Sequence, residues 1–273
     1  MYCDTRGGMI LKLRMISQYD HFPHKTAGPD TNNPRMYVDG KIWQALEEPS
    51  EPTDLLLMIE PRSIQPGNYQ LAMEKYDRFR YIFTHDSQLL SFAPNALPIY
   101  YWRDYELKNA KKSKDISMIC GTKDMCPIHH ERMKIADAIA DRVDILGDYV
   151  GEHCTIDEAY TPYKFAVVIE NYSDDYWFTE KILNAFSHKT VPIYYGARKI
   201  YNIFNNRGII TVSNLWDIPE IIDILIEKGI DKEYDHMLPA IKENYNVVQA
   251  YMDFEDYFFT EYGQLIDRFR EDI

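Results

Sequence analysis

The stretch FAVVIENYSDDYWFTEKILNAFSHKTVPIYYG, residues Phe165–Gly196, decides the fold class of this chain. It opens with a short apolar run at Phe165–Ile169, typical of a buried strand, and continues into a polar loop. Thr179 stands where a helix N-cap is expected, and apolar residues recur at helical spacing over Glu180–His188. A second apolar run at Val191–Tyr194 completes a strand–helix–strand unit. This order predicts two parallel strands joined by a crossover helix.

The same alternation continues on both sides of this unit. Further strands are expected at Ile116–Ile119, Val143–Leu146 and Ile209–Val212, and further helices at Arg132–Arg142 and Ile218–Lys228. Strands that alternate with helices of this length indicate a parallel sheet with helices on its faces. We therefore predict a Rossmann-like domain over residues 114–245.

The first half of the chain has a different texture. Its apolar runs predict strands joined by loops rich in Pro, Asn and Gly, at Ile10–Ile16, Asp54–Ile59, Phe79–Phe83 and Pro98–Trp102. We assign residues 1–105 to an N-terminal domain and the polar segment Glu106–Lys114 to a linker. Residues 246–273 carry apolar side chains at helical spacing and predict a C-terminal helical tail that packs across both domains.

Composition excludes several classes of protein. The chain has 273 residues, 45% of them hydrophobic, so two folded domains are expected. No run of eighteen apolar residues and no signal peptide are visible, which predicts no integral membrane segment and a cytoplasmic location. A net charge of −13 disfavours nucleic acid and anionic membranes as partners. The four cysteines are too few for a disulfide scaffold, and separate thiols are expected at Cys120 and Cys126.

The polar residues within 165–196 predict an anion site. Glu170 and Asn171 follow a buried strand, where ligands bind in open α/β sheets. Lys181 falls in the first turn of the next helix, where the helix dipole already disfavours a positive charge. A diphosphate bound in front of this turn would remove the conflict. On spacing alone, an ordinary surface pair of Glu180 with Lys181 remains the alternative.

This segment resembles the donor-binding motif of glycosyltransferase family 10, the α1,3/α1,4-fucosyltransferases. The matching positions are Phe165, Ile169-Glu170-Asn171, Thr179-Glu180-Lys181, Val191-Pro192 and Gly196. Ile169 stands where the family usually has Phe, and Trp177 stands where bacterial relatives carry Tyr. The resemblance implies an α/β, GT-B-like fold of two facing Rossmann-like domains with a C-terminal crossover helix. The C-terminal domain would hold the donor.

The resemblance also implies roles for individual residues. Arg132 matches an arginine directed at the donor phosphates, a task suited to a planar guanidinium that never loses its charge. Glu60 follows the apolar run 54–59 and precedes a proline, as the family's catalytic base does, and Arg62 nearby would keep it ionised. The remaining donor-binding candidates are Asn171, Trp177, Thr179, Glu180 and Lys181.

The implied reaction is a single displacement with inversion. Glu60 would take the proton of an acceptor hydroxyl as that hydroxyl attacks the anomeric carbon of GDP-β-L-fucose. Arg132, Lys181 and the helix N-terminus would stabilise the departing diphosphate. The expected partners are GDP-fucose and an oligosaccharide or polysaccharide acceptor. No cofactor and no metal site are expected to be required, although a divalent cation would stimulate GDP release.

Two other functions fit the same residues. The fold could use another nucleotide-sugar donor, because phosphate- and ribose-binding groups do not read the hexose. A carbohydrate- or nucleotide-binding protein without turnover is the second alternative. Asp174-Asp175 and His129-His130-Glu131 are expected to be loop and helix-entry residues rather than metal ligands. His85-Asp86, after the strand expected at Phe79–Phe83, is expected either to line the acceptor side or to cap a loop.

Overall fold

The computed structural model describes residues 13–19, 33–100, 107–109, 111–251 and 254–268. The chain divides into two compact units. Unit 1 comprises Met1–Ile99 and Phe254–Ile273, and unit 2 comprises Tyr100–Asp253. The chain therefore enters unit 2 once and returns to unit 1 with its last helix.

Unit 1 contains a parallel five-stranded sheet in which strand order follows chain order, β1-β2-β3-β4-β5. The strands are β1 (Arg14–Ile16), β2 (Arg35–Val38), β3 (Leu55–Met58), β4 (Tyr81–Thr84) and β5 (Ala96–Pro98). Three helices connect strands β2 to β5: α1 (Ile42–Glu47), α2 (Pro66–Glu74) and α3 (Ser87–Phe92). Each strand lies next to the preceding strand of the chain, always on the same side. Right-handed crossovers therefore place these three helices on one face of the sheet.

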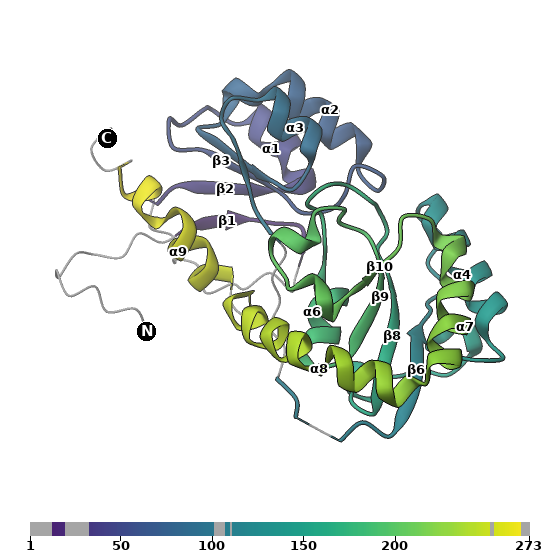
Figure 1. Ribbon diagram of the computed structural model, residues 1–273. Coiled ribbons are helices and arrows are strands. Elements are labelled where there is room, and N and C mark those ends of the chain that lie inside the picture. The colour runs from purple at the N-terminus through teal and green to yellow at the C-terminus, as the bar shows by residue number, and fades with distance from the viewer. Residues whose placement is uncertain (1–12, 20–32, 101–106, 110, 252–253, 269–273) are drawn as a thin grey trace. The chain divides into compact units, whose positions relative to one another are not determined.

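Alternate side chains of the strands supply the two faces of this sheet. Leu56, Met58 and Ile82 join a buried cluster with residues of the three helices. Phe83, the neighbour of Ile82, points to the other face and packs edge-on against Phe258 of α9 (Phe254–Asp267), with ring centroids 4.9 Å apart. Figure 1 shows α9 on the opposite side of the sheet from α1, α2 and α3. The C-terminal helix thus completes a three-layer α/β unit.

Unit 2 contains a second parallel sheet, in the order β10-β9-β8-β6-β7. Its strands are β6 (Lys114–Ile119), β7 (Asp144–Leu146), β8 (Tyr163–Ile169), β9 (Val191–Tyr195) and β10 (Ile210–Thr211). Every residue of β8 is buried, as expected of a central strand covered on both faces.

Two groups of helices cover this sheet. α4 (Pro127–Ile139) contacts α7 (Ile218–Lys228), and Figure 1 shows them side by side. α5 (Ile156–Tyr160), α6 (Glu180–Ser187) and α8 (Ile230–Val247) pack together, and α8 also contacts β8 and β9. The result is a Rossmann-like layer order, so the predicted α/β fold with two Rossmann-like domains is confirmed.

Several local predictions were wrong. The loops expected between the strands of the first half are interrupted by α1, α2 and α3, and β2 was not anticipated. The helix expected at Arg132–Arg142 begins at Pro127, because proline at the first helical position needs no hydrogen-bonded N–H. Lys114, assigned to the linker, belongs to β6. Helices α5 and α8 were also missed. Residues 10–12 and 101–102 of two predicted strands lie outside the described residues.

The cysteines and the helices bear on the predictions from composition. Cys120, Cys126 and Cys154 are free thiols, as expected for the first two. Cys3 lies outside the described residues. Within the part of the chain that the structure describes, no helix combines the length and the apolar character needed to cross a bilayer.

Asp54, immediately before β3, ties three segments of unit 1 together. Its fully buried carboxylate accepts hydrogen bonds from Arg35 Nε at 2.6 Å and Arg35 Nη2 at 2.7 Å. Arg78 Nη1 pairs with the same carboxylate at 2.5 Å. Both arginine side chains are largely buried, at 8% and 12% exposure. Removing the carboxylate would therefore leave two buried cations without their shared counter-charge.

We expect Asp54→Asn to lower the free energy of unfolding by about 3 kcal/mol, the order of magnitude for breaking a buried ion pair. Urea unfolding followed by far-UV circular dichroism measures this change. A loss below about 0.5 kcal/mol, typical of a surface substitution, would show that the two arginines find other partners.

Candidate functional site

The carboxyl edge of the unit 2 sheet contains a topological switch point. From β6 the chain crosses to β7 on one side, and then returns past β6 to β8 on the other. Open parallel sheets bind ligands at such a reversal, beyond the carboxyl ends of the strands. The loops 120–126 and 170–179 follow β6 and β8 and meet there, since the Cys126 thiol contacts the Asn171 carbonyl oxygen at 3.6 Å.

Glu170 joins the end of β8 to the start of α6. Its side chain is fully buried and accepts hydrogen bonds from Thr179 N at 2.8 Å and Thr179 Oγ1 at 2.7 Å. Thr179 is also the N-cap of α6, as predicted, and accepts from Lys181 N at 3.4 Å. One carboxylate therefore closes the loop 171–178 and fixes the first turn of the helix.

The charge of Lys181 has a partner in this cluster. Its Nζ lies 3.2 Å from Glu170 Oε2 and 3.8 Å from Glu180 Oε1. Burial alone would lower the pKa of Lys181, but the two carboxylates raise it above its ordinary value. The conflict between this lysine and the helix dipole is thus resolved by Glu170. The ion pair relieves the conflict without a bound anion, and the diphosphate site stays a prediction.

Arg132 lies on α4 at the same edge of the sheet and is 8% exposed. Its Nε is buried without a hydrogen-bond partner, and no carboxylate pairs with its guanidinium among the described residues. The side chain interacts with the Cys120 thiol and lies near enough to Lys181 to lower the pKa of that amine. A buried guanidinium without a counter-charge is costly unless a ligand supplies the negative charge.

His129 lies one turn before Arg132 and was treated as a helix-entry residue. It is 1% exposed, and its Nδ1 accepts a hydrogen bond from Met125 N at 3.0 Å. That bond leaves the proton of the neutral ring on Nε2. Burial lowers the pKa of His129, and Arg132 lowers it further, while the Asn171 side chain opposes the change. His129 therefore belongs to the same cluster as Arg132 and Asn171. Because α4 begins at Pro127, His129 and Arg132 lie one turn apart on the same helix.

The other candidates of unit 2 occupy the same loop. Trp177 is 2% exposed and its ring lies edge-on to Tyr172, with centroids 6.2 Å apart. Gly196 follows β9 where an added Cβ would lie 2.6 Å from Glu170 Cγ and 2.3 Å from the Tyr194 hydroxyl oxygen. Only glycine allows this close approach. Gly196 thus leaves the space that the buried Glu170 side chain occupies.

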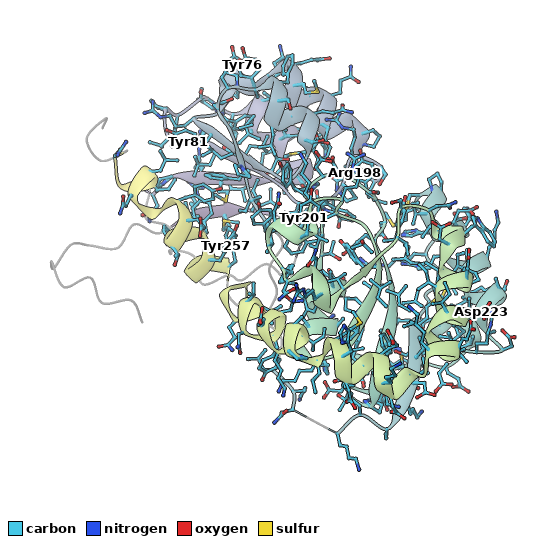
Figure 2. All side chains as sticks on the ribbon, viewed as in Figure 1. Tyr76, Tyr81, Arg198, Tyr201, Asp223 and Tyr257 are labelled. Carbon is cyan, nitrogen blue, oxygen red and sulfur yellow. The ribbon has the colours of Figure 1, made fainter. Side chains whose placement is uncertain are left out.

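The doubled aspartates of this loop form ion pairs. Asp175 pairs with Arg198 at 2.7 Å and with Lys199 at 2.8 Å, and Arg198 is labelled in Figure 2. Asp174 lies 3.7 Å from Arg198. These contacts hold the loop 171–178 against the segment after β9, consistent with the interpretation of both aspartates as loop residues.

Glu60 lies at the carboxyl edge of the unit 1 sheet, two residues after β3, and is half-buried. Asp39, at the end of the neighbouring strand β2 and fully buried, accepts hydrogen bonds from the backbone N–H groups of Ile59 and Glu60. Tyr69 donates its hydroxyl proton to the Glu60 carbonyl oxygen at 2.7 Å. The backbone of the candidate base is therefore fixed on both sides by buried side chains.

Arg62 and the pair His85-Asp86 surround this position. Arg62 forms a bidentate pair with Asp86, at 2.7 Å and 3.0 Å. Asp86 also caps α3 by accepting from Leu89 N. His85 Nε2 lies 3.0 Å from the Ile59 carbonyl oxygen. These residues build the loops at the strand ends.

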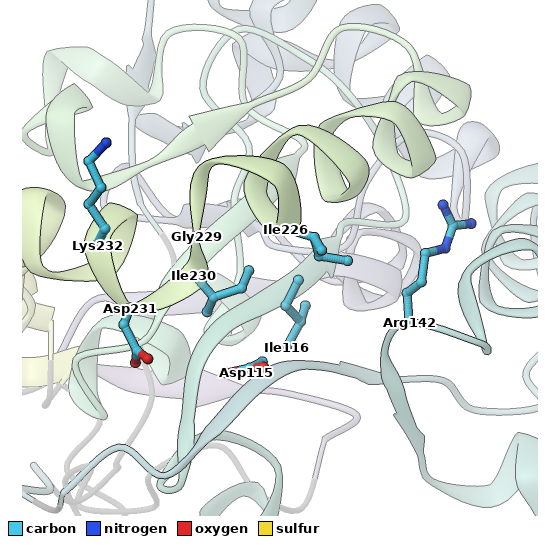
Figure 3. Close-up of a pocket in the computed structure, with 8 residues that line it drawn as sticks. All are labelled: Asp115, Ile116, Arg142, Ile226, Gly229, Ile230, Asp231 and Lys232. Atoms are coloured by element: carbon cyan, nitrogen blue, oxygen red, sulfur yellow. The ribbon is translucent and has the colours of Figure 1, made fainter.

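A pocket of about 520 Å³ occupies the other end of the unit 2 sheet. Figure 3 shows its lining, which includes Asp115 and Ile116 at the start of β6 and Gly229 between α7 and α8. Amino ends of parallel strands are not where open α/β sheets bind their ligands. The candidate donor residues belong to the opposite edge.

Several solved glycosyltransferases have a similar arrangement of elements. An α1,3-fucosyltransferase is similar over 85% of this chain and 93% of its own, with 16% identity and a TM-score of 0.50. The pneumococcal O-GlcNAc transferase GtfA is similar over 86% of this chain and 56% of its own, with 12% identity and a TM-score of 0.52. The fold is therefore that of the GT-B class of glycosyltransferases.

The sequence gives the family within that class. The C-terminal domain of glycosyltransferase family 10 (fucosyltransferase) matches residues 101–270. The chain belongs to this family. It is also 32% identical to the alpha-(1,3)-fucosyltransferase FucT of Helicobacter pylori over 68 residues, which are 25% of this chain and 14% of that relative.

The environment of Asp39 predicts a pH-dependent stability. Burial, opposed by its hydrogen bonds, raises the pKa of Asp39 from 3.8 to about 7 in the folded chain. Between these values the folded state binds a proton that the unfolded state releases, so this contribution to stability is lost as the pH rises toward 7. Asp39→Asn should flatten the decline in unfolding free energy between pH 4 and pH 7, measured by urea unfolding. Exposed Asp77→Asn is the control, and an unchanged slope in Asp39→Asn would contradict the prediction.

Proposed function

We propose that this chain is an inverting fucosyltransferase that transfers L-fucose from GDP-β-L-fucose to a hydroxyl group of a glycan acceptor, in α1,3 linkage. The observation that carries the proposal is the buried Arg132, which has no carboxylate partner among the described residues. Its position at the switch point of the sheet suits a diphosphate. A solved α1,3-fucosyltransferase with GDP, at 16% identity and a TM-score of 0.50, supports a guanosine diphosphate as the ligand.

The donor site is assigned to unit 2. Arg132 has the fork geometry that binds two phosphate oxygens, and Lys181 adds a second positive charge nearby. Lys181 is shared with Glu170, so its contribution to an anion is smaller than that of a free lysine. Glu180, half-buried at the start of α6, is proposed to accept hydrogen bonds from ribose hydroxyls. Asn171, Trp177 and Thr179 shape the loop around the donor.

The chemical step needs a base and a stabilised leaving group. Glu60 takes the proton of the acceptor hydroxyl while its oxygen forms a bond to the anomeric carbon. The bond from that carbon to the diphosphate oxygen breaks, GDP departs, and the configuration inverts. Arg132 and Lys181 stabilise the charge that develops on the diphosphate. The step uses protein side chains alone, and we propose that a divalent cation stimulates GDP release without being required.

Two alternatives are separated by binding and turnover. Calorimetric titration with GDP-fucose, GDP-mannose, UDP-galactose and GDP identifies the donor, and tighter binding of another nucleotide sugar would favour a different transferase. A protein that binds GDP-fucose but transfers nothing to any glycan acceptor would favour the non-catalytic function. The cytoplasmic location stays a prediction, which fractionation of the source cells tests.

Arg132→Ala should weaken GDP binding by about 10- to 100-fold, because charge-assisted hydrogen bonds contribute about 1.5–3 kcal/mol each and 1.4 kcal/mol is tenfold in affinity. Isothermal titration calorimetry measures the change. Arg142→Ala is the control, since Arg142 follows the end of the same helix and already pairs with Asp141 and Asp223. Equal GDP affinity in the wild-type protein and Arg132→Ala would show that the donor does not bind at the carboxyl edge of the unit 2 sheet.

Glu60→Gln should lower kcat by about 10²- to 10⁴-fold, the usual contribution of a general base, and leave GDP affinity unchanged. Initial rates with GDP-fucose and a lactosamine acceptor provide the measurement. Glu74→Gln, at the exposed end of α2 in the same unit, is the matched control. Retention of full kcat in Glu60→Gln would show that another group takes the acceptor proton.

A further inference from the structure

Asp39 lies at the carboxyl edge of the unit 1 sheet in a tightly constrained conformation. It follows β2 directly, is 0% exposed and has a backbone φ of +45°. Aspartate tolerates the left-handed region better than most residues, but this conformation is still less favourable than ordinary backbone. Such strain persists only where the surrounding contacts over-determine the conformation. The contacts that hold Asp39 in this conformation therefore indicate its role.

The carboxylate of Asp39 binds the backbone just after β3. Its Oδ1 accepts from Ile59 N at 2.7 Å, and its Oδ2 accepts from Glu60 N at 3.2 Å. The Tyr19 hydroxyl donates to Oδ2 at 2.9 Å and itself accepts from Gln65 Nε2 at 3.0 Å. Two successive N–H groups beyond the sheet ladder are therefore held by a single buried side chain.

The carbonyl groups of the same two residues are held from other elements. Tyr69 of α2 donates to the Glu60 carbonyl oxygen at 2.7 Å, and His85 Nε2 lies 3.0 Å from the Ile59 carbonyl oxygen. Tyr69 and His85 also contact each other at 3.2 Å. All four polar backbone groups of Ile59 and Glu60 thus have side-chain partners. The direction of the Glu60 Cα–Cβ bond is fixed, which leaves only its side-chain torsions to vary.

We propose that Asp39 is the positioning residue of the catalytic base: it locks the backbone at Ile59–Glu60 so that the Glu60 carboxylate is held toward the acceptor hydroxyl. This inference rests on the proposed function, in which Glu60 is the base. Asp39 acts through Glu60 and does not touch the substrate. Preorganisation of this kind reduces the cost of reaching a reactive geometry, where a displacement of about 1 Å can cost 100-fold in rate.

A purely structural brace would make a different prediction. Its loss would lower stability and the fraction of folded protein, whatever residue stands at position 60. A positioning residue instead loses its effect on rate when the group that it positions is absent. The two roles are therefore separated by a double-mutant cycle between Asp39 and Glu60.

The experiment compares Asp39→Ala in the wild-type and Glu60→Gln backgrounds, with single-turnover rates measured from radiolabelled GDP-fucose and corrected for folded protein. We expect Asp39→Ala alone to lower the rate at least 10-fold with GDP affinity unchanged, and to add less than twofold to the loss in Glu60→Gln. Asp39→Asn keeps one acceptor oxygen for the Ile59 N–H group and should show a smaller loss. Amide hydrogen exchange at Ile59 and Glu60 should accelerate in Asp39→Ala.

Asp54→Asn is the matched control, because Asp54 is equally buried but lies at the opposite end of β3 and pairs with arginines. It should lower stability and leave the rate per folded molecule unchanged. Multiplicative losses in the Asp39→Ala, Glu60→Gln double variant, or an Asp54→Asn loss equal to that of Asp39→Ala, would overturn the inference alone. Absence of transfer by the wild-type protein would overturn the proposed function and this inference with it.

Discussion

The candidate donor site depends on the contacts of the buried Glu170 carboxylate. It binds the backbone and hydroxyl of Thr179 and the amine of Lys181, so the end of β8 and the start of α6 form one rigid corner. Burial raises the pKa of Glu170, and Lys181 opposes this change. The corner also explains Gly196, since a side chain there would meet Glu170 and Tyr194.

Because Glu170 pairs with Lys181, the buried cation without a carboxylate partner in this cluster of described residues is Arg132. The two cations are near each other, yet only one has a carboxylate partner among the described residues. The net charge of −13 over the whole chain therefore does not prevent an anion site. One paired and one unpaired cation, placed where the strand order reverses, form the kind of local setting in which open parallel sheets bind phosphate groups.

The sequence identified the elements that carry strong periodicity and missed those that depend on tertiary contacts. The run 165–196 has a clear strand–helix–strand pattern, and its N-cap at Thr179 was correctly placed. Helix α8 contains Pro239, which normally interrupts a helix, yet packing against β8 and β9 sustains it. The pairing of Lys181 with Glu170 could not be predicted either, because nine residues, 171–179, separate Glu170 from the first residue of α6. Similarly, nothing local in the sequence indicates that Asp39 binds the backbone at Ile59 and Glu60.

Both units use the same device at the carboxyl edge of a parallel sheet. Backbone N–H groups outside the ladder need acceptors, and a fully buried carboxylate supplies them in each unit. Asp39 accepts from the residues just after β3 in unit 1, and Glu170 accepts from Thr179 at the start of α6 in unit 2. The two carboxylates differ in their counter-charge. Glu170 has Lys181, whereas Asp39 has no ion-pair partner among the described residues and faces Tyr19, Tyr69 and Glu60. The pKa of Asp39 accordingly rises to about 7. The backbone at the candidate base is therefore held by a group that titrates near neutrality, whereas the corner at the candidate donor site is held by an ion pair.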